Sequence, residues 1–201
     1  MIAPHFQLRV LAAAGIMVFL SSCHSAPTKL FVLDAVAPTS ISSSYNGPPI
    51  RVEAIHVPPA LDRIEISREV APGEFTVSEL DHWIAPLGQI TRQVLTADLI
   101  GRLPQGRVIF PHLARPVGAI GINVDLLSFS ADREGARLHV SWAGTSDGPQ
   151  PQSCGGTMVL LTPRLGDGSA SMASALSTLL AQLADGIVAQ LMLLNPVVPS
   201  T

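Results

Sequence analysis

"AIGINVDLLSFSADREGARLHVSWAG", residues 119–144, contains two apolar alternations separated by a short polar segment. Every second residue is apolar over residues 120–126, and the apolar phase then moves by one residue at Leu127. A change of phase by one residue predicts a β-bulge. Every second residue is again apolar over residues 138–142. The stretch therefore predicts two β-strands, each with one apolar face.

Further short strands are predicted on both sides of this stretch. Residues 50–57 alternate and end at Pro58 and Pro59, because proline cannot continue a central strand. The other predicted strands are "RIEISRE" (63–69), "FTVS" (75–78), "RVIF" (107–110) and "GTMVLLT" (156–162). Pro72 and Gly73 separate the first two of these as a turn.

A first amphipathic helix is predicted over residues 78–103. Apolar residues recur there at a spacing of three to four. Ser78 and Asp81 resemble an N-terminal capping box, which places the start of the helix at this point. Pro86 lies inside the pattern and removes a backbone hydrogen bond, so a kink is expected there.

A second amphipathic helix is predicted from Ser169. It is weakened at Gly186 and ends before Pro196. Several strands, a helix, more strands and a closing helix indicate an α+β fold. We expect a mixed, largely antiparallel sheet packed against two amphipathic helices on one face.

Composition excludes some classes of partner. Of the 201 residues, 47% are hydrophobic and 13% are charged, and the formal net charge is −3. Lysine and arginine form no cluster. Neither nucleic acid nor an anionic lipid surface is therefore indicated as an electrostatic partner.

The N-terminus has the pattern of a secretory signal. Arg9 precedes an uncharged apolar run over residues 10–20, which is too short to span a bilayer comfortably. "LSSC" at residues 20–23 resembles the bacterial lipobox. We expect residues 1–22 to be a lipoprotein signal peptide and Cys23 to carry fatty acyl chains such as palmitate. The alternative is an ordinary signal peptide in which this cysteine is incidental.

The rest of the chain divides into three parts. Residues 23–49 are predicted to be the lipidated N-terminus and a tether, with one short strand within "LFVLDAV". Residues 50–195 form one domain, and residues 196–201 form a proline-rich tail. By the sorting rule of enterobacteria, aspartate after the lipidated cysteine retains a lipoprotein in the inner membrane. His24 stands there instead, which predicts the periplasmic face of the outer membrane.

The sequence shows no pattern typical of an enzyme. The histidines lack the spacing of a zinc site, and no cofactor motif is present, so neither a metal nor a cofactor is predicted. No serine lies in a GxSxG motif, although a triad assembled through space is not excluded by sequence. Cys154 is interpreted as a free thiol, with an intermolecular disulfide or a reactive nucleophile as the alternatives.

Two features could serve binding. Trp83 and Trp142 lie at apolar positions of predicted elements, so a core position is favoured over partner contact. "PPALDR", residues 58–63, pairs two prolines with an aspartate and an arginine. This stretch is either a rigid surface turn or a recognition loop.

These stretches, in this order, resemble the ABC-type transport auxiliary lipoproteins, specifically the PqiC-like group. "IRVEAIHVPPALDRIEISRE" is similar to that family's strand, turn and following strand, and "ELDHWIAPLGQITRQVLTADLIGRLP" to the start of its helix. "INVDLLSFSADREGARLHVSWAG" and "ASALSTLLAQLADGIVAQL" resemble its hairpin and its closing helix. The turn and helix-start positions of the family motif are occupied by Pro58, Leu61, Asp62, Arg63, Arg68, Trp83, Pro86 and Leu87.

The resemblance implies a non-enzymatic docking component of a transport system. In such systems an outer-membrane lipoprotein works with an MCE-domain protein, and through it with an inner-membrane permease and ATPase. They move lipids or other hydrophobic molecules between the two membranes. The expected partner-binding residues are Pro58, Leu61, Asp62, Arg63 and Trp83. MCE partners are usually rings, so a homo-oligomeric ring is expected; a lone lipid-binding module and an envelope hydrolase are the alternatives.

Overall fold

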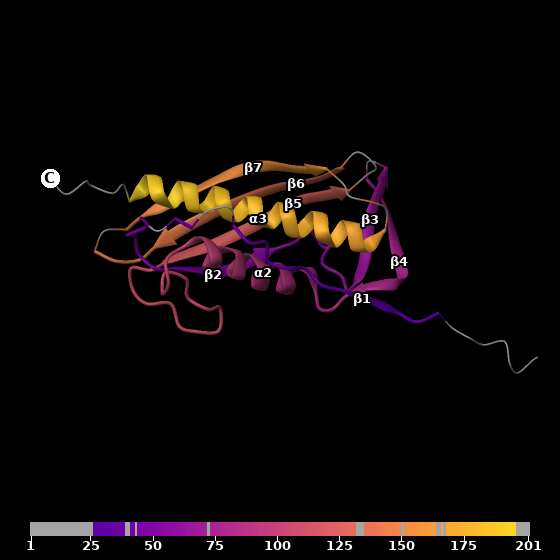
Figure 1. The fold of residues 1–201 in the computed structure, drawn as a ribbon, viewed down its shortest axis with the longest axis horizontal. Coiled ribbons are helices and arrows are strands. Elements are labelled where there is room, and N and C mark those ends of the chain that lie inside the picture. The colour runs from indigo at the N-terminus through magenta and orange to yellow at the C-terminus, as the bar shows by residue number, and fades with distance from the viewer. Residues whose placement is uncertain are drawn as a thin grey trace, which may run out of the picture.

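Two β-sheets and two helices make up the described part of the chain in this computed structural model (Figure 1). The described residues are 26–38, 41–42, 44–71, 73–131, 135–149, 151–163, 166 and 168–195. The predicted signal peptide, Cys23 and the tail at residues 196–201 lie outside them.

The helices and strands follow the chain in this order. The strands are β1 (Lys29–Phe31), β2 (Ile50–His56), β3 (Glu65–Ala71), β4 (Glu74–Trp83), β5 (Ile120–Ala131), β6 (Gly135–Ser146) and β7 (Ser153–Pro163). The helices are α2 (Leu87–Arg102), between β4 and β5, and α3 (Ser169–Leu194), after β7.

The larger sheet has the strand order β2-β5-β6-β7. β2 and β5 run parallel, and the other neighbours are antiparallel. The register between β5 and β6 shifts between Leu126 and Ser128, which confirms the predicted bulge. Beyond the bulge, Phe129 is again buried. The extra residue thus keeps both halves of this long strand apolar toward the core.

Both helices lie on one face of the larger sheet. α3 packs against β6, β7 and α2, and α2 packs against β2 (Figure 1). α3 is long and apolar enough to cross a membrane, yet more than half of its most apolar stretch is buried inside the domain. We therefore assign α3 to the core. The predicted α+β fold is confirmed, with one addition: the strands form two sheets.

The second, smaller sheet lies across one end of the molecule, in the order β1-β4-β3 (Figure 1). β1 pairs with β4 in parallel, and β3 pairs with β4 antiparallel. α3 begins beside this sheet. The Ser169 hydroxyl, at the start of α3, donates a hydrogen bond of 2.7 Å to Asp81 Oδ2 on β4.

The predicted start of the first helix is wrong. β4 continues to Trp83, and α2 begins at Leu87. The Ser78 hydroxyl does accept a hydrogen bond from the Asp81 amide, at 2.9 Å, but this contact closes a bulge in β4. Pro86 precedes the helix as its N-cap residue, where a missing N–H has no cost, so no kink results.

The predicted strand over residues 107–110 is also wrong. Val108 makes a single parallel bridge to Ile50, and the segment between α2 and β5 is otherwise irregular. The Ile50 amide donates to the Arg107 carbonyl at 2.8 Å, and the Ile109 amide donates to the Ile50 carbonyl at 2.8 Å. A strand-like composition there produces one contact to the edge of β2 and no ladder.

The N-terminal segment packs on the helices over much of its length. The predicted short strand is present as β1. After it, Leu33 and Tyr45 are buried, at 6% and 1% exposure. The Asp34 amide donates to the Ser177 hydroxyl of α3 at 3.1 Å. The boundary at residue 49 stays a prediction, but these contacts leave less chain free than a tether over residues 23–49 would have.

A buried pair, Arg102 and Asp98, joins this segment to both helices together with Asp185, whose side chain is exposed. Arg102 Nε donates to Asp185 Oδ1 of α3 at 2.6 Å, and Arg102 Nη1 lies 3.3 Å from Asp98 Oδ1. Arg102 Nη1 also donates to the Val36 carbonyl at 3.2 Å, while the Val36 amide donates to Asp98 Oδ1 at 2.9 Å. Arg102 and Asp98 are 3% and 1% exposed. We name Arg102, Asp98, Asp185 and Val36 the Arg102 cluster.

Burial raises the pKa of Asp98 to about 6. The Val36 amide and the Arg102 guanidinium oppose this rise, and the Asp185 carboxylate adds to it. Asp98 Oδ2 is buried with no hydrogen-bond partner among the described residues. Such an oxygen favours the protonated acid, because an ionised carboxylate needs partners when it leaves water.

We expect the free energy of unfolding to depend on pH through the titration of Asp98. Between the ordinary pKa of an aspartate and about 6, the folded state keeps a proton that the unfolded state releases. The Asp98 contribution to the free energy of unfolding therefore falls as pH rises, by about 2 to 3 kcal/mol from about pH 4 to about pH 7. Asp98→Asn keeps an oxygen acceptor for the Val36 amide but does not titrate.

Urea unfolding of the wild type and of Asp98→Asn across this pH range measures the effect. The wild type should lose stability relative to the variant as pH rises. The comparison isolates Asp98, because the other titrating groups contribute equally to both proteins. Parallel pH profiles for the two proteins would contradict the assignment.

Candidate interaction surface

The loop between β2 and β3 is a tight, internally bonded turn. The Pro58 carbonyl accepts hydrogen bonds from the Leu61 amide at 2.8 Å and from the Asp62 amide at 3.0 Å. The Leu61 side chain is 4% exposed and belongs to the core. The Ser67 hydroxyl of β3 donates to the Ala60 carbonyl at 2.9 Å. The loop over residues 58–63 is therefore rigid, and its role in recognition stays a prediction.

Asp62 bonds to the beginning of α2. Its Oδ1 accepts a hydrogen bond of 3.2 Å from the Gly88 amide. Pro86, the N-cap residue, provides no side-chain cap of its own. The first amides of a helix have no intrahelical partner, so a carboxylate at this position is stabilising. A loop far away in sequence thus supplies the cap of α2.

Arg63 lies on the outside of the same loop. Its Nε is 3.4 Å from Glu65 Oε2 on β3, and both side chains are largely exposed. The pKa of Glu65 is lowered, first by a hydrogen bond from its own backbone and then by Arg63. An exposed pair of this kind contributes little to stability, so Arg63 is free to exchange partners.

Trp83 lies in the core and not on the surface. Its side chain is 2% exposed, and its amide donates to the Ile64 carbonyl at 2.7 Å. The sequence-based preference for a core position is confirmed. The predicted binding residues thus divide: Pro58, Asp62 and Arg63 reach the surface, while Leu61 and Trp83 support them from the core. Binding through these residues stays a prediction.

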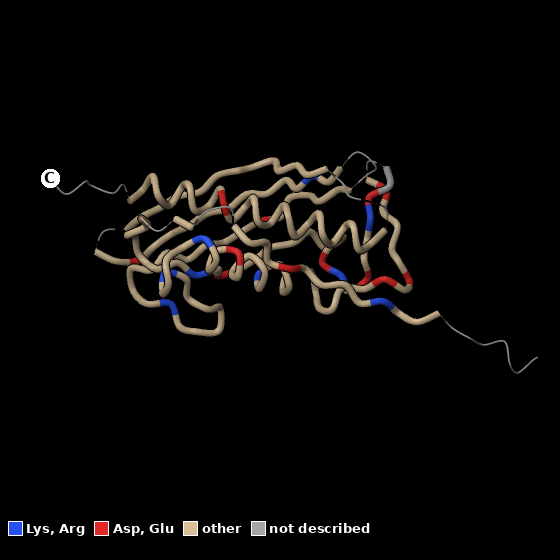
Figure 2. Tube along the Cα trace, viewed as in Figure 1, with Lys and Arg blue, Asp and Glu red and all other residues tan. Residues whose placement is uncertain are grey.

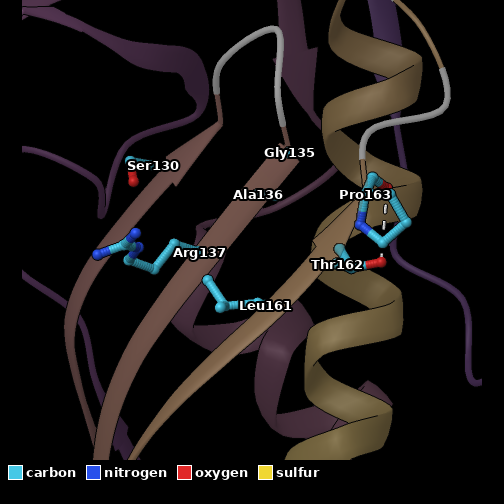
Figure 3. Close-up of a pocket in the computed structure, with 7 residues that line it drawn as sticks. All are labelled: Ser130, Gly135, Ala136, Arg137, Leu161, Thr162 and Pro163. Carbon is cyan, nitrogen blue, oxygen red and sulfur yellow. Dashed lines mark hydrogen bonds between the residues drawn. The ribbon is translucent and has the colours of Figure 1, made fainter.

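A pocket of about 470 Å³ opens at the turn end of β5, β6 and β7. Figure 3 shows Arg137 extending toward β5, which carries Ser130, and Leu161 beside it on β7. One cation, two hydroxyl groups and several apolar side chains line the pocket. Among the described lining residues, no nucleophile is paired with a base.

The next candidates for reactive chemistry are metal-binding side chains and the Cys154 thiol. Among the residues that the structure describes, no group of three histidine, cysteine, aspartate or glutamate side chains could hold a metal ion. Cys154 is half-buried and free, and its Sγ lies 3.8 Å from the Gly144 carbonyl oxygen. Burial raises the pKa of the Cys154 thiol. A thiol in that state is a poor nucleophile at neutral pH.

Sequence reasoning missed two of these sites. The cap that Asp62 supplies joins residues that are 26 positions apart, so no local pattern reveals it. Asp98 and Arg102 lie four residues apart among the apolar positions of the helix. Charged residues placed on the buried stripe of a helix are a usable signal for a buried pair, although their third partner, Asp185, is not predictable from that spacing.

Residues 31–188 match the model of a protein family described as the ABC-type transport auxiliary lipoprotein component. The chain belongs to this family. The resemblance found in its motifs is thereby confirmed, and the PqiC-like group is consistent with it. The family consists of lipoproteins that assist ABC-type transport, so association with a membrane and with a transport system follows.

Two solved structures share the fold of this transport auxiliary lipoprotein. A crystal structure of an uncharacterized protein has a TM-score of 0.67 at 18% identity, covering 82% of this chain and 98% of that one. Protein XCC0632 from Xanthomonas campestris has a TM-score of 0.63 at 15% identity, covering 83% and 95%. No curated protein matches the sequence. At these identities the likeness concerns the fold alone.

We expect Asp62→Ala to destabilise the lipoprotein by about 0.5 to 2 kcal/mol, the usual cost of a lost helix cap. Asp62→Asn should recover most of this, because an amide oxygen also accepts a bond from the Gly88 amide. Asp125→Ala, at an exposed aspartate of β5, is the matched control and should have little effect. Urea unfolding of the three variants measures the difference. Equal losses for Asp62→Ala and Asp125→Ala would contradict the capping role.

Proposed function

We propose that this protein is a non-catalytic docking component of an MCE-type ABC transport system. Anchored to the periplasmic face of the outer membrane by acyl chains on Cys23, it engages the MCE-domain protein. Through that protein it is linked to the inner-membrane permease and ATPase. The system moves lipids or other hydrophobic molecules between the two membranes and so supports membrane integrity.

The observation that carries this proposal is the family match, which extends from β1 into α3. The rigid Pro58–Arg63 loop adds a specific surface. Its backbone is fixed by internal hydrogen bonds, so little conformational entropy is lost when a partner binds. Asp62 and Arg63 present one charge of each sign at its tip, which suits polar recognition of a protein.

The larger sheet supports self-association into a ring. No described helix covers its outer face, and among the described strands β7 pairs with β6 alone. Val159 and Leu161 on β7 are 55% and 58% exposed. Gln182 of α3 donates to one edge carbonyl, that of Leu161, at 3.2 Å. A long edge strand with exposed apolar side chains is a natural site for another chain.

A lipid-binding module is the second candidate function. A groove of about 330 Å³ runs between the N-terminal segment and α3. Phe31, Val32 and Ala173 are among its apolar lining residues. It is an apolar surface at which an acyl chain could lie. Native mass spectrometry of protein purified from cells, showing no retained lipid, would remove this candidate.

Photocrosslinking in cells tests the docking role. A photoreactive amino acid at Arg63 should recover an MCE-domain protein, because this side chain lies outside the rigid loop. The same amino acid at Leu193, which is 75% exposed on the last turn of α3, is the matched control. Recovery of the partner from neither position, or equally from both, would contradict a docking role for the loop.

The lipid anchor gives a separate prediction. Cys23→Ala should release the protein from the outer-membrane fraction and abolish complementation of a deletion strain, because a thiol is needed to accept the diacylglyceryl group. Cys154→Ala removes the other cysteine and should change neither result. Fractionation and complementation assays measure both. If Cys23→Ala still sediments with outer membranes and complements, the anchor is not Cys23.

A further inference from the structure

The outer face of the smaller sheet exposes apolar side chains. Residues directly opposite each other in paired strands share a face, so Leu30 lies on the side of His82, and Val77 and Phe75 lie on the side of Ser67 and Glu69. His82 also pairs with Glu65, which alternates with Ser67 and Glu69 along β3. All these residues therefore share one face, on which Ser67 is 4% exposed because the Ala60 carbonyl covers it.

Four apolar residues of this face are exposed. The Ile84 amide donates to the Phe31 carbonyl at 3.0 Å, which continues the β1–β4 pairing and places Ile84 on the side of Leu30. The exposures are 63% for Leu30, 58% for Ile84, 41% for Val77 and 38% for Phe75. On the opposite face of this sheet, Ile66 and Trp83 are 2% exposed. We name Leu30, Phe75, Val77 and Ile84 the end patch.

The end patch lies where the chain enters the domain. β1 begins at Lys29, six residues after Cys23. Six extended residues span at most about 20 Å. If Cys23 is lipidated as proposed above, the first residue of β1 lies within this distance of the point where the acyl chains enter the bilayer. This places the β1 side of the smaller sheet near the membrane surface.

The opposite end of the molecule is not confined in this way. α3 begins beside the smaller sheet and extends for 26 residues, or about 39 Å, toward the other end (Figure 1). The irregular segment between α2 and β5 lies at that far end (Figure 1). Its residues Phe110 and Leu113 are 50% and 49% exposed. Both ends therefore expose apolar side chains, but only the end with the smaller sheet lies close to Cys23 along the chain.

The charges of the end patch favour apolar contact over electrostatic attraction. Arg63 is paired with Glu65, and Glu69 Oε1 accepts a hydrogen bond from the Gly73 amide at 3.0 Å. His82 is a further titratable group of this face, whereas Lys29 alternates with Leu30 along β1 and so lies on the other face. Figure 2 shows charges of both signs at this end. Without an excess of cations, the surface has no preference for anionic headgroups.

We propose that the end patch is a membrane-contact surface, which rests on the headgroup region of the bilayer that holds the acyl chains of Cys23. This inference rests on the proposed lipidation and adds an orientation to it. The sheet lies flat against the bilayer, its exposed apolar side chains enter the interface, and the long axis points into the periplasm. The far end of the domain is then held clear of lipid.

Site-specific fluorescence on the lipidated protein tests this orientation. In a Cys154→Ala background, Val77→Cys and Phe110→Cys are each labelled with an environment-sensitive dye, since the lipidated Cys23 does not react. Each protein is reconstituted into vesicles of phosphatidylethanolamine with a minor fraction of phosphatidylglycerol. The dye at residue 77 should shift to shorter wavelength and be shielded from iodide. The dye at residue 110, the matched control, should stay accessible.

Three outcomes separate the alternatives. If the protein does not float with the vesicles, the lipid anchor fails, and the proposed function fails with it. If it floats but the dye at residue 77 is as accessible as the dye at residue 110, only the end patch proposal is overturned. If shielding rises with protein density at constant lipid, a second copy covers the patch, and the proposal is again overturned.

A second variant tests whether the label at residue 77 itself disturbs the local fold. Val77→Asp changes an exposed residue, so thermal unfolding should be unaffected, and flotation should persist through the acyl chains. A dye at Ile84→Cys should then lose its shielding, because the charge lifts the sheet from the interface. Unchanged shielding at residue 84 would count against insertion of the end patch.

Discussion

The Arg102 cluster holds together three segments that are far apart in sequence. One guanidinium bonds to the N-terminal segment through Val36, to its own helix through Asp98, and to α3 through Asp185. A charge buried to this degree is tolerated only when several hydrogen bonds replace its water. The cluster therefore requires all three segments to be in place at once. It links the packing of the helices to the path of the chain that leads toward Cys23.

That path has a functional consequence. Asp34 and Val36, after β1, are bonded to α3 and α2, and the anchor proposed at Cys23 precedes the first residue of β1 by only six positions. A long tether would let the domain search a wide volume and bind in any orientation. The short connection that the proposed anchor implies would instead set one end of the domain beside the bilayer. In the proposed docking complex, such fixed geometry would reduce the entropy lost on docking.

The sequence patterns predicted the structure correctly where the two-residue period of a strand and the 3.6-residue period of a helix could be told apart. The shift of phase at Leu127 predicted the β5 bulge because a bulge adds one residue to the alternation. They failed at residues 78–86, where Leu80, Trp83 and Ile84 have helical spacing by coincidence. The bulge in β4 breaks the strand alternation there, and the capping hydrogen bond of Ser78 occurs in both settings. Pairing with β1 and β3, from distant parts of the chain, decided in favour of a strand.

The sequence alone determined the class of fold, the family and the predicted anchor, because each of these depends on local order: alternation, helical spacing and a short motif. Tertiary structure alone decided how the elements meet. It placed Asp62 at the start of α2, brought Asp185 to Arg102, buried Trp83 and turned four apolar residues of the smaller sheet outward. These outcomes depend on contacts between residues tens of positions apart. No local pattern encodes such contacts, because the free energy that selects them comes from burial in the complete core.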